Sequence, residues 1–130
     1  MKDYILKEIN KIGQMIESIL VKIKLLKVRQ NESVYEFSKI ELLDKLSLNI
    51  DSLLEQDNIV EILIKEHEFN SENLDKFAEL LYDITIATNI EAERLKLAKS
   101  ISAIYEHLDK NDRYFSFNRF YILKGLEEYT

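Results

Sequence analysis

Residues 3–26 read DYILKEINKIGQMIESILVKIKLL, and an isoleucine or leucine returns along this stretch at alternating steps of four and three. The recurring positions, together called the isoleucine seam, are Ile5, Ile9, Ile12, Ile16, Ile19, Ile23 and Leu26. This spacing predicts a long amphipathic helix over residues 1–30, because residues three and four apart share one helix face. Such a helix, about 42 Å long, exceeds the roughly 30 Å diameter of a globule of this size. The seam is therefore expected either to be covered by several later helices or to be shared with another chain.

The composition of the whole chain also favours helices. The 130 residues contain no proline, cysteine or tryptophan and only two glycines, Gly13 and Gly125. Sheet proteins need many turns built from glycine, proline and short polar residues, so this scarcity predicts a few long helices. The sequence predicts a single all-α domain over residues 1–130, in which the long N-terminal helix packs on antiparallel helical hairpins.

Polar residues divide the rest of the chain into shorter helices. Ser33 with Glu36 matches a capping box, Asn70 or Ser71 is the expected cap of a later helix, and Asn89 is the expected break after it. The predicted helices cover residues 34–47, 50–56, 58–65, 71–88, 91–108 and 116–129, with 33–65 as a broken middle and 70–130 as a run of hairpins. Leu95, Ala98, Ile101, Tyr105 and Leu108 define the expected inner face of the helix over 91–108.

The charges are unevenly distributed. The net charge is −6, yet residues 1–30 hold seven basic residues against three acidic ones. The other 100 residues hold 11 basic and 21 acidic residues and would repel a polyanion, so no nucleic-acid partner is expected. No apolar run approaches the ~20 residues that span a bilayer, and no apolar signal core follows Met1. We expect a bacterial, cytoplasmic protein without a membrane partner.

No catalytic, metal or cofactor site is predicted. A di-iron bundle needs glutamate three residues before histidine, but Ile64 precedes His67 and Ile104 precedes His107 at that spacing. Zinc-protease and glycine-rich phosphate-binding motifs are absent from the sequence. Gly13 is expected to let a neighbouring helix approach closely. The sequence therefore favours a protein that is not an enzyme.

An aromatic cluster near the C-terminus allows two interpretations. It consists of Tyr114, Phe115, Phe117, Phe120, Tyr121 and Tyr129, with Arg113 and Arg119 interleaved. Aromatic residues at helical spacing usually pack inside, which favours Phe117, Phe120 and Tyr121 as the inward face of the last helix. The alternative is a surface patch that binds a partner.

The stretch Leu108-Asp109-Lys110-Asn111-Asp112, preceded by Ala98, resembles the end of a tetratricopeptide repeat. The second helix of that repeat closes on a Leu-Asp-Pro-Asn-type turn, and Lys110 stands where the repeat prefers proline. The resemblance covers residues 74–112, and it implies that the C-terminal part of the chain is tetratricopeptide-like.

The opening Asp3-Tyr4-Ile5-Leu6, followed by Ile9, Gly13 and Met15-Ile16, resembles a family of uncharacterised bacterial helical proteins. Members of that family begin with a long helix of this type and end with tetratricopeptide-like hairpins. The stretch Tyr114-Phe115-Ser116-Phe117-Asn118-Arg119 is similar to the aromatic–Ser–x–x–Arg segment before the family's last helix. The resemblance implies a helical-hairpin fold and no known activity or site residues.

These patterns predict a non-enzymatic protein–protein interaction or scaffold module, with a homodimer through the first helix. The side chains expected to carry that association are Ile9, Ile12, Ile16, Ile19 and Ile23. Charged residues at Ile12 and Ile16 would then leave a folded monomer, whereas unfolding would make the seam part of the core. The alternative is a regulatory domain that binds a peptide or small ligand in an inter-helix groove formed by Tyr105, Arg119 and Tyr121.

Overall fold

The computed structural model describes residues 2–29, 33–111 and 117–128, with side chains described for 11–26, 33–111 and 118–128. The helices are α1 (Lys2–Arg29), α2 (Val34–Leu46), α3 (Ile50–Leu54), α4 (Ile59–His67), α5 (Ser71–Ala87), α6 (Glu91–Asn111) and α7 (Phe117–Leu126). All regular structure in the described part of the chain is α-helical, so the predicted all-α class is confirmed.

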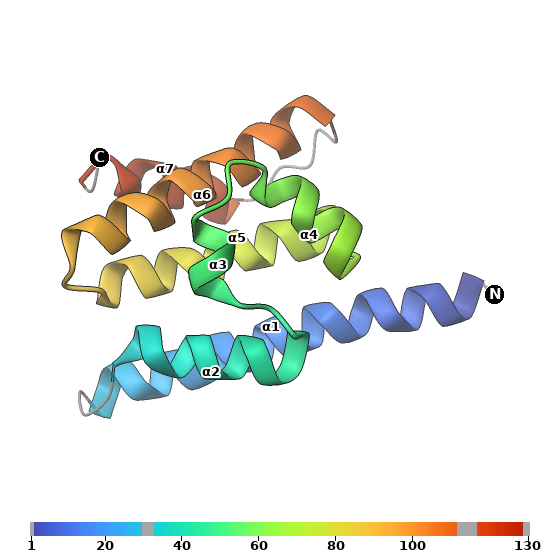
Figure 1. Cartoon of the computed structure of the whole chain (residues 1–130), viewed down its shortest axis with the longest axis horizontal. Helices are drawn as coiled ribbons and strands as arrows, with labels where there is room; N and C mark the ends of the chain where they lie inside the picture. Colours follow the sequence, from blue (N-terminus) through green and yellow to red (C-terminus); the bar gives the residue numbers. More distant parts are fainter. Residues whose placement is uncertain (1, 30–32, 112–116, 129–130) are drawn as a thin grey trace.

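The helices form two antiparallel pairs with short helices across them (Figure 1). One pair is α1 with α2, and the other is α5 with α6. Helix α1 runs alongside α5, while α7 contacts both α5 and α6. Helices α3 and α4 connect the two pairs, and the first turns of α1 extend beyond the end of α2 (Figure 1).

Short polar side chains fix where the helices begin, as the sequence predicted. The side chain of Ser33 accepts a hydrogen bond from the backbone N–H of Glu36, 3.3 Å away. Asn70 and Asn73 form a reciprocal capping box at the start of α5, with bonds of 2.8 and 3.1 Å. These bonds satisfy backbone groups that a helix end leaves without partners. Helix α2 ends at Leu46, and the capping residue Ser47 takes the left-handed conformation with φ 52°.

One predicted boundary is wrong by a full turn. A polar turn was expected from Asp109, yet α6 continues to Asn111. Lys110 donates to Glu106 over 2.9 Å, and the side chain of Asn111 donates to the carbonyl of His107 over 3.1 Å. Contacts between residues four apart stabilise a helix, and they extend α6 through a stretch whose composition reads as a turn.

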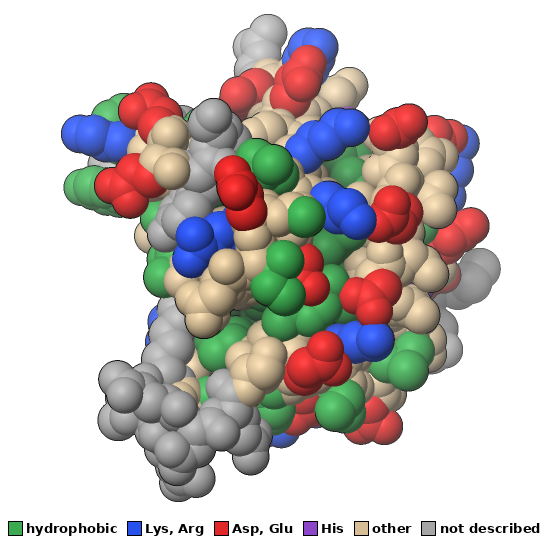
Figure 2. All heavy atoms as spheres, turned by 60° about the vertical axis from the view of Figure 1, so that its left-hand side comes forward, with side chains coloured by type: hydrophobic (Ala, Val, Ile, Leu, Met, Phe, Trp, Pro, Cys, Tyr) green, Lys and Arg blue, Asp and Glu red, His purple; other side chains and the backbone are tan. Residues whose placement is uncertain are grey.

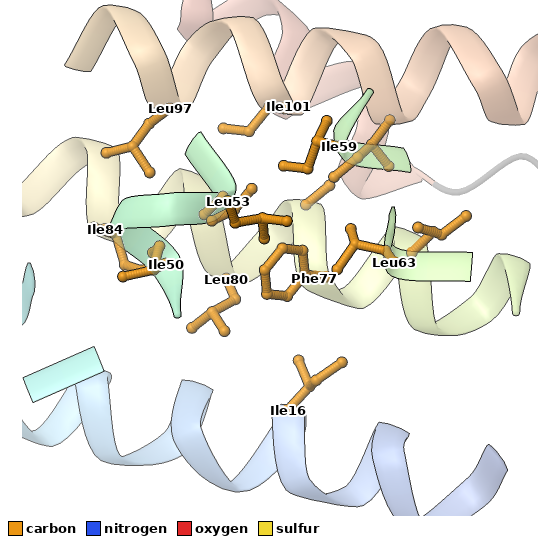
Figure 3. Packing of buried hydrophobic residues seen from close by; sticks show 14 of the residues in the cluster. Ile16, Ile50, Leu53, Ile59, Leu63, Phe77, Leu80, Ile84, Leu97 and Ile101 are labelled. Carbon is orange, nitrogen blue, oxygen red and sulfur yellow. The ribbon is translucent and has the colours of Figure 1, made fainter. Parts of the chain in front are cut away.

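A single hydrophobic cluster draws residues from every helix, and Figure 3 shows part of it. Phe77 of α5 lies near its centre, with Ile16 of α1 on one side and Ile101 of α6 on the other (Figure 3). Phe69 packs edge-on against Phe77, with ring centroids 5.5 Å apart. Burial of this cluster is the main stabilising term of the fold, since burying one large apolar side chain contributes about 1.5–3 kcal/mol.

Gly13 of α1 faces the start of α5. A Cβ atom at Gly13 would stand 3.3 Å from the Nδ2 atom of Asn73, which is itself buried. The predicted close approach of a neighbouring helix at this glycine is confirmed. One turn further along, Lys76 of α5 pairs with Glu17 of α1 at 3.7 Å.

Some apolar residues remain on the surface at the end of the molecule where α5 turns into α6. Figure 2 shows this end, with hydrophobic side chains surrounded by charged ones. Ile86, Ile90 and Leu95 of this region are all exposed. The placement of Leu95 on the inner face of its helix is therefore wrong, because the first turn of α6 faces solvent and burial begins at Leu97.

Candidate functional site

Helix α7 packs on the body of the molecule through one narrow side. Ile122 and Leu126 are buried there, and Gly125 lies against the ring of Tyr82 from α5. A Cβ atom at Gly125 would stand 2.9 Å from Cζ of Tyr82 and closer still to its hydroxyl oxygen. A larger residue at this position would require the ring of Tyr82 to move, because Cβ atoms do not normally come within 3.0 Å of a neighbour.

Arg119 holds the start of α7 to the last turns of α6. It is only 4% exposed, and its guanidinium forms an ion pair with Asp109. Its Cζ atom also lies 5.3 Å from the ring centroid of Tyr105, a distance that allows a cation–π interaction. A buried arginine with two such partners fixes the rotation of α7 about its own axis.

A row of acidic residues runs along α5. Asp75, Glu79 and Asp83 recur every four residues along α5, and Asp75 is buried. Burial, followed by repulsion from Asp83, raises the pKa of Glu79 above its ordinary value. Burial and the charges of Asp75 and Glu79 raise the pKa of Tyr105, whose hydroxyl has no hydrogen-bond partner among the described residues.

Three residues of α7 have exposed apolar side chains, which together are called the α7 face, and Phe120 lies between Tyr121 and Leu123 around the helix. Phe120 is 59% exposed and Tyr121 is 67% exposed, while Leu123 is also exposed. The two aromatic rings lie edge to face, with centroids 5.8 Å apart and an interplanar angle of 81°. Neighbouring apolar side chains that point into solvent together indicate a contact surface.

The expectation that Phe120 and Tyr121 point into the core is therefore wrong. The inner side of α7 is already occupied by Arg119, Ile122 and Leu126, which share a helix face through their spacing of three and four. The side chain of Phe117 and all of 112–116 lie outside the described residues.

The predicted groove residues separate into two environments. Tyr105, which is 2% exposed, and Arg119 lie together in the interior. Tyr121 follows Arg119 by two positions, so it lies on nearly the opposite side of α7 and faces solvent. The three residues do not line a common groove.

The isoleucine seam lies mainly inside the chain. Ile16, Ile19 and Ile23 have 0% exposure, whereas Ile12 is half-buried. The side chain of Ile9 lies outside the described residues. Helices α2 and α5 cover the middle of the seam, so these three buried side chains offer no surface to a second chain in this structure.

A groove between α4 and α6 was not anticipated from the sequence. It encloses about 450 Å³ and is lined by Val60 and Ile64 of α4 with Ala103 and His107 of α6, among others. Val60 and Ile64 recur four residues apart, which equally fits residues of a core. Nothing in the sequence indicates that α6 leaves the Val60 and Ile64 side of α4 partly uncovered.

The described residues give no sign of a metal centre or a membrane span. They include no group of three or more histidine or acidic side chains placed to hold a metal ion. Neither histidine therefore belongs to such a group. His67 ends α4, and His107 lies beside Asn111. None of the described helices is long and apolar enough to cross a membrane.

Comparison of the chain with protein-family models, with curated proteins and with solved structures gives no match. The resemblances to the tetratricopeptide repeat and to the bacterial helical family therefore stay predictions.

Proposed function

We propose that this protein is a non-enzymatic, cytoplasmic interaction module that binds a partner protein on the α7 face. The observation that carries the proposal is the exposure of Phe120 and Tyr121 side by side on a short helix, with Leu123 exposed one turn from Phe120. Aromatic residues are enriched among the few side chains that supply most of the binding energy in protein interfaces.

The way α7 is held also supports the proposal. Arg119, Ile122 and Leu126 fix its inner side, and the contact of Gly125 with Tyr82 sets its distance from α5. A face that is ordered before binding loses little conformational entropy when a partner docks. The α7 face therefore suits a rigid docking surface more than a flexible one.

Site-specific photo-crosslinking in cells that make the protein natively tests this proposal. A photoreactive phenylalanine analogue replaces Tyr121, and Ile40 of α2, 66% exposed, receives the same analogue as the matched control. We expect a discrete crosslinked protein from position 121 that Phe120→Ser abolishes. Equal crosslinking from positions 121 and 40, or none from 121, contradicts a docking role for the α7 face.

The second part of the proposal is a homodimer through α1, with an interface that uses only part of the isoleucine seam. The first turns of α1 extend beyond α2 (Figure 1), and Ile12 at the edge of this part is only half-buried. The interface would involve Ile12 and Ile9 more than the three buried isoleucines. Light scattering over a concentration series should show a dimer that Ile12→Asp dissociates, whereas a strict monomer excludes it.

The alternative function is a regulatory domain that binds a peptide or small ligand between helices. The groove between α4 and α6 supports it, because its volume and its apolar lining by Val60, Ile64 and Ala103 suit such ligands. A ligand that binds there raises the melting temperature in proportion to occupancy. Thermal-shift screens with peptide and metabolite panels separate this alternative from a purely protein-binding module.

A further inference from the structure

Two lysine side chains meet at one carboxylate where α1 and α2 lie side by side. The Nζ atom of Lys22 in α1 lies 3.0 Å from Oε1 of Glu41 in α2, and the Nζ atom of Lys45 in α2 lies 3.7 Å from Oε2 of the same carboxylate. Lys45 also donates a hydrogen bond to the hydroxyl of Ser18 in α1 over 3.3 Å. Two ammonium groups therefore share one carboxylate, which leaves one positive charge in excess.

Lys99 of α6 shows the ordinary arrangement of a surface lysine. It pairs with Asp57 at 3.5 Å, and its side chain is 79% exposed. The side chain of Lys45, by contrast, is 23% exposed and lies next to a second cation. Partial burial and a neighbouring like charge thus distinguish Lys45 from Lys99.

Both features disfavour the protonated form of the Lys45 amino group. An ammonium group loses hydration on burial and is repelled by a like charge, so its pKa falls. The pKa of Lys45 is lowered, first by its contact with Lys22 and then by burial, and these effects outweigh the attraction of Glu41. The pKa of Lys22 is raised, first by the same contact and then by Glu41, so Lys22 keeps its proton when Lys45 loses one. A neutral amine is a nucleophile, whereas an ammonium group is not.

Lys45 also lines a hollow of about 360 Å³, which leaves room for a small reagent. The other charged or titratable side chains that line the hollow are Lys11 of α1 and, at the end of α4, Glu66, His67 and Glu68. Asp51 of α3, which packs against α2, pairs with Lys39 at 2.6 Å. Lys76 of α5, which also packs against α2, pairs with Glu17 at 3.7 Å.

We propose that Lys45 is a modification site that accepts an acyl group from a small activated donor, either an acyl phosphate or a thioester. The lone pair of Nζ forms a bond to the acyl carbon, and the bond from that carbon to the phosphate oxygen or thiol sulfur breaks. The leaving phosphate or thiolate takes the electron pair of that bond and the proton that the nitrogen loses. The product is a neutral amide, which no longer forms an ion pair with Glu41.

Site-resolved mass spectrometry of the full chain after brief exposure to a donor tests the proposal. The donors are acetyl phosphate and the acetyl thioester of N-acetylcysteamine, and Lys99 of the same chain is the internal control. If exposure alone set the rate of acylation, Lys99 would react faster. We expect Lys45 to react at least about threefold faster than Lys99 at pH 7, because a larger fraction of it is neutral. The rate at Lys45 should also level off at a lower pH than the rate at Lys99.

The difference between the two lysines depends on the fold. It should therefore disappear in guanidinium chloride, where both residues lie in an unfolded chain. A higher ratio of Lys45 to Lys99 acylation with acetyl phosphate identifies acyl phosphates as the donor class, and a higher ratio with the thioester identifies thioesters.

Two substitutions of the neighbouring charges should change the rate at Lys45 in opposite directions. Lys22→Gln removes the like charge and should slow acylation of Lys45 by at least about threefold. Glu41→Gln removes the attraction that holds the proton and should speed acylation by a similar factor. Substitutions that only disturbed the packing of α1 against α2 would shift both rates in the same direction. Circular dichroism checks that both variants are folded.

The proposal is overturned if Lys45 reacts no faster than Lys99 in the folded chain, or if the two rates level off at the same pH. It is also overturned if the difference persists in guanidinium chloride, or if the two variants do not change the rate at Lys45 in opposite directions. None of these results affects the α7 face, because Lys22, Glu41 and Lys45 lie on other helices.

Discussion

The burial of helices α1 and α7 differs from what their sequence patterns suggest, and it differs in opposite directions. The isoleucine seam of α1 is regular enough to form an interface between chains, yet Ile16, Ile19 and Ile23 lie in the core of one chain. The aromatic residues of α7 suggest a core, yet Phe120 and Tyr121 face solvent. Periodicity identifies which side chains share a face, but it does not identify what covers that face.

The number of neighbouring helices explains the difference. Helix α1 packs against α2 and α5, which together cover the middle of its apolar side. Helix α7 is 10 residues long, carries apolar residues around most of its circumference, and contacts α5 and α6 along one side. A helix that is apolar all round but has neighbours on one side exposes the remainder.

A charge in the middle of the isoleucine seam should have the largest effect on the stability of the fold. Ile16→Asp places a carboxylate where the side chain has no contact with water, and the expected loss of stability is about 4 kcal/mol or more. Urea denaturation followed by circular dichroism measures it. Val21→Asp on the exposed side of the same helix is the control, with an expected change within about 0.5 kcal/mol. If Ile16→Asp instead gave a folded monomer, the isoleucine seam would be an interface between chains and not part of the core.

Adding a side chain at the close contact between α7 and α5 should have the next largest effect on stability. Gly125→Ala adds a methyl group that overlaps Tyr82, and overpacking of this kind typically destabilises by about 1–3 kcal/mol. Better helix propensity offsets up to about 1 kcal/mol of that loss. In a Tyr82→Leu background the same substitution should be neutral or stabilising. An equal loss in both backgrounds would show that this contact does not hold α7.

Some parts of this architecture follow from local chemistry and can be predicted from the sequence. Ser33 and Asn70 cap helices because their side chains reach backbone groups three residues ahead, and Gly13 marks a close helix contact. The orientation of α7 depends instead on Arg119 finding Tyr105 and Asp109 on another helix. The groove between α4 and α6 depends on two helices from different parts of the chain, so neither segment alone reveals it.

A smaller effect, of opposite sign, is expected where α1 and α7 approach the same carboxylate. Glu79 of α5 accepts a hydrogen bond from Asn118 of α7 over 3.4 Å and is attracted by Lys24 of α1. Its pKa is nevertheless raised, chiefly by burial and then by Asp83, so the folded state holds the proton more tightly than the unfolded state does.

The sign of the pH dependence follows from that raised pKa. This glutamate disfavours folding at neutral pH, and the penalty is relieved as the pH falls through its folded pKa toward the ordinary value of about 4.3. Glu79→Gln should therefore raise the melting temperature slightly at pH 7 and lose that advantage near pH 4. Asp51→Asn is the opposite control, because Lys39 and Tyr35 lower the pKa of Asp51. A lower melting temperature for Glu79→Gln at pH 7 would show that the charged carboxylate stabilises this junction.

The smallest expected change in stability belongs to the α7 face, and it completes the contrast with the seam. Phe120→Ser removes a large side chain that is mostly in water, so the free energy of unfolding should change by no more than about 0.5 kcal/mol. Ile122→Ser, two residues along the same helix and 4% exposed, should instead lose about 2 kcal/mol or more, because it replaces a buried apolar group with a hydroxyl. Urea denaturation of the two variants gives the comparison directly. If Phe120→Ser were as damaging as Ile122→Ser, the ring would be packing within the chain and would be no docking surface. If stability is kept while crosslinking from position 121 is lost, the aromatic pair is maintained for a partner and not for the fold.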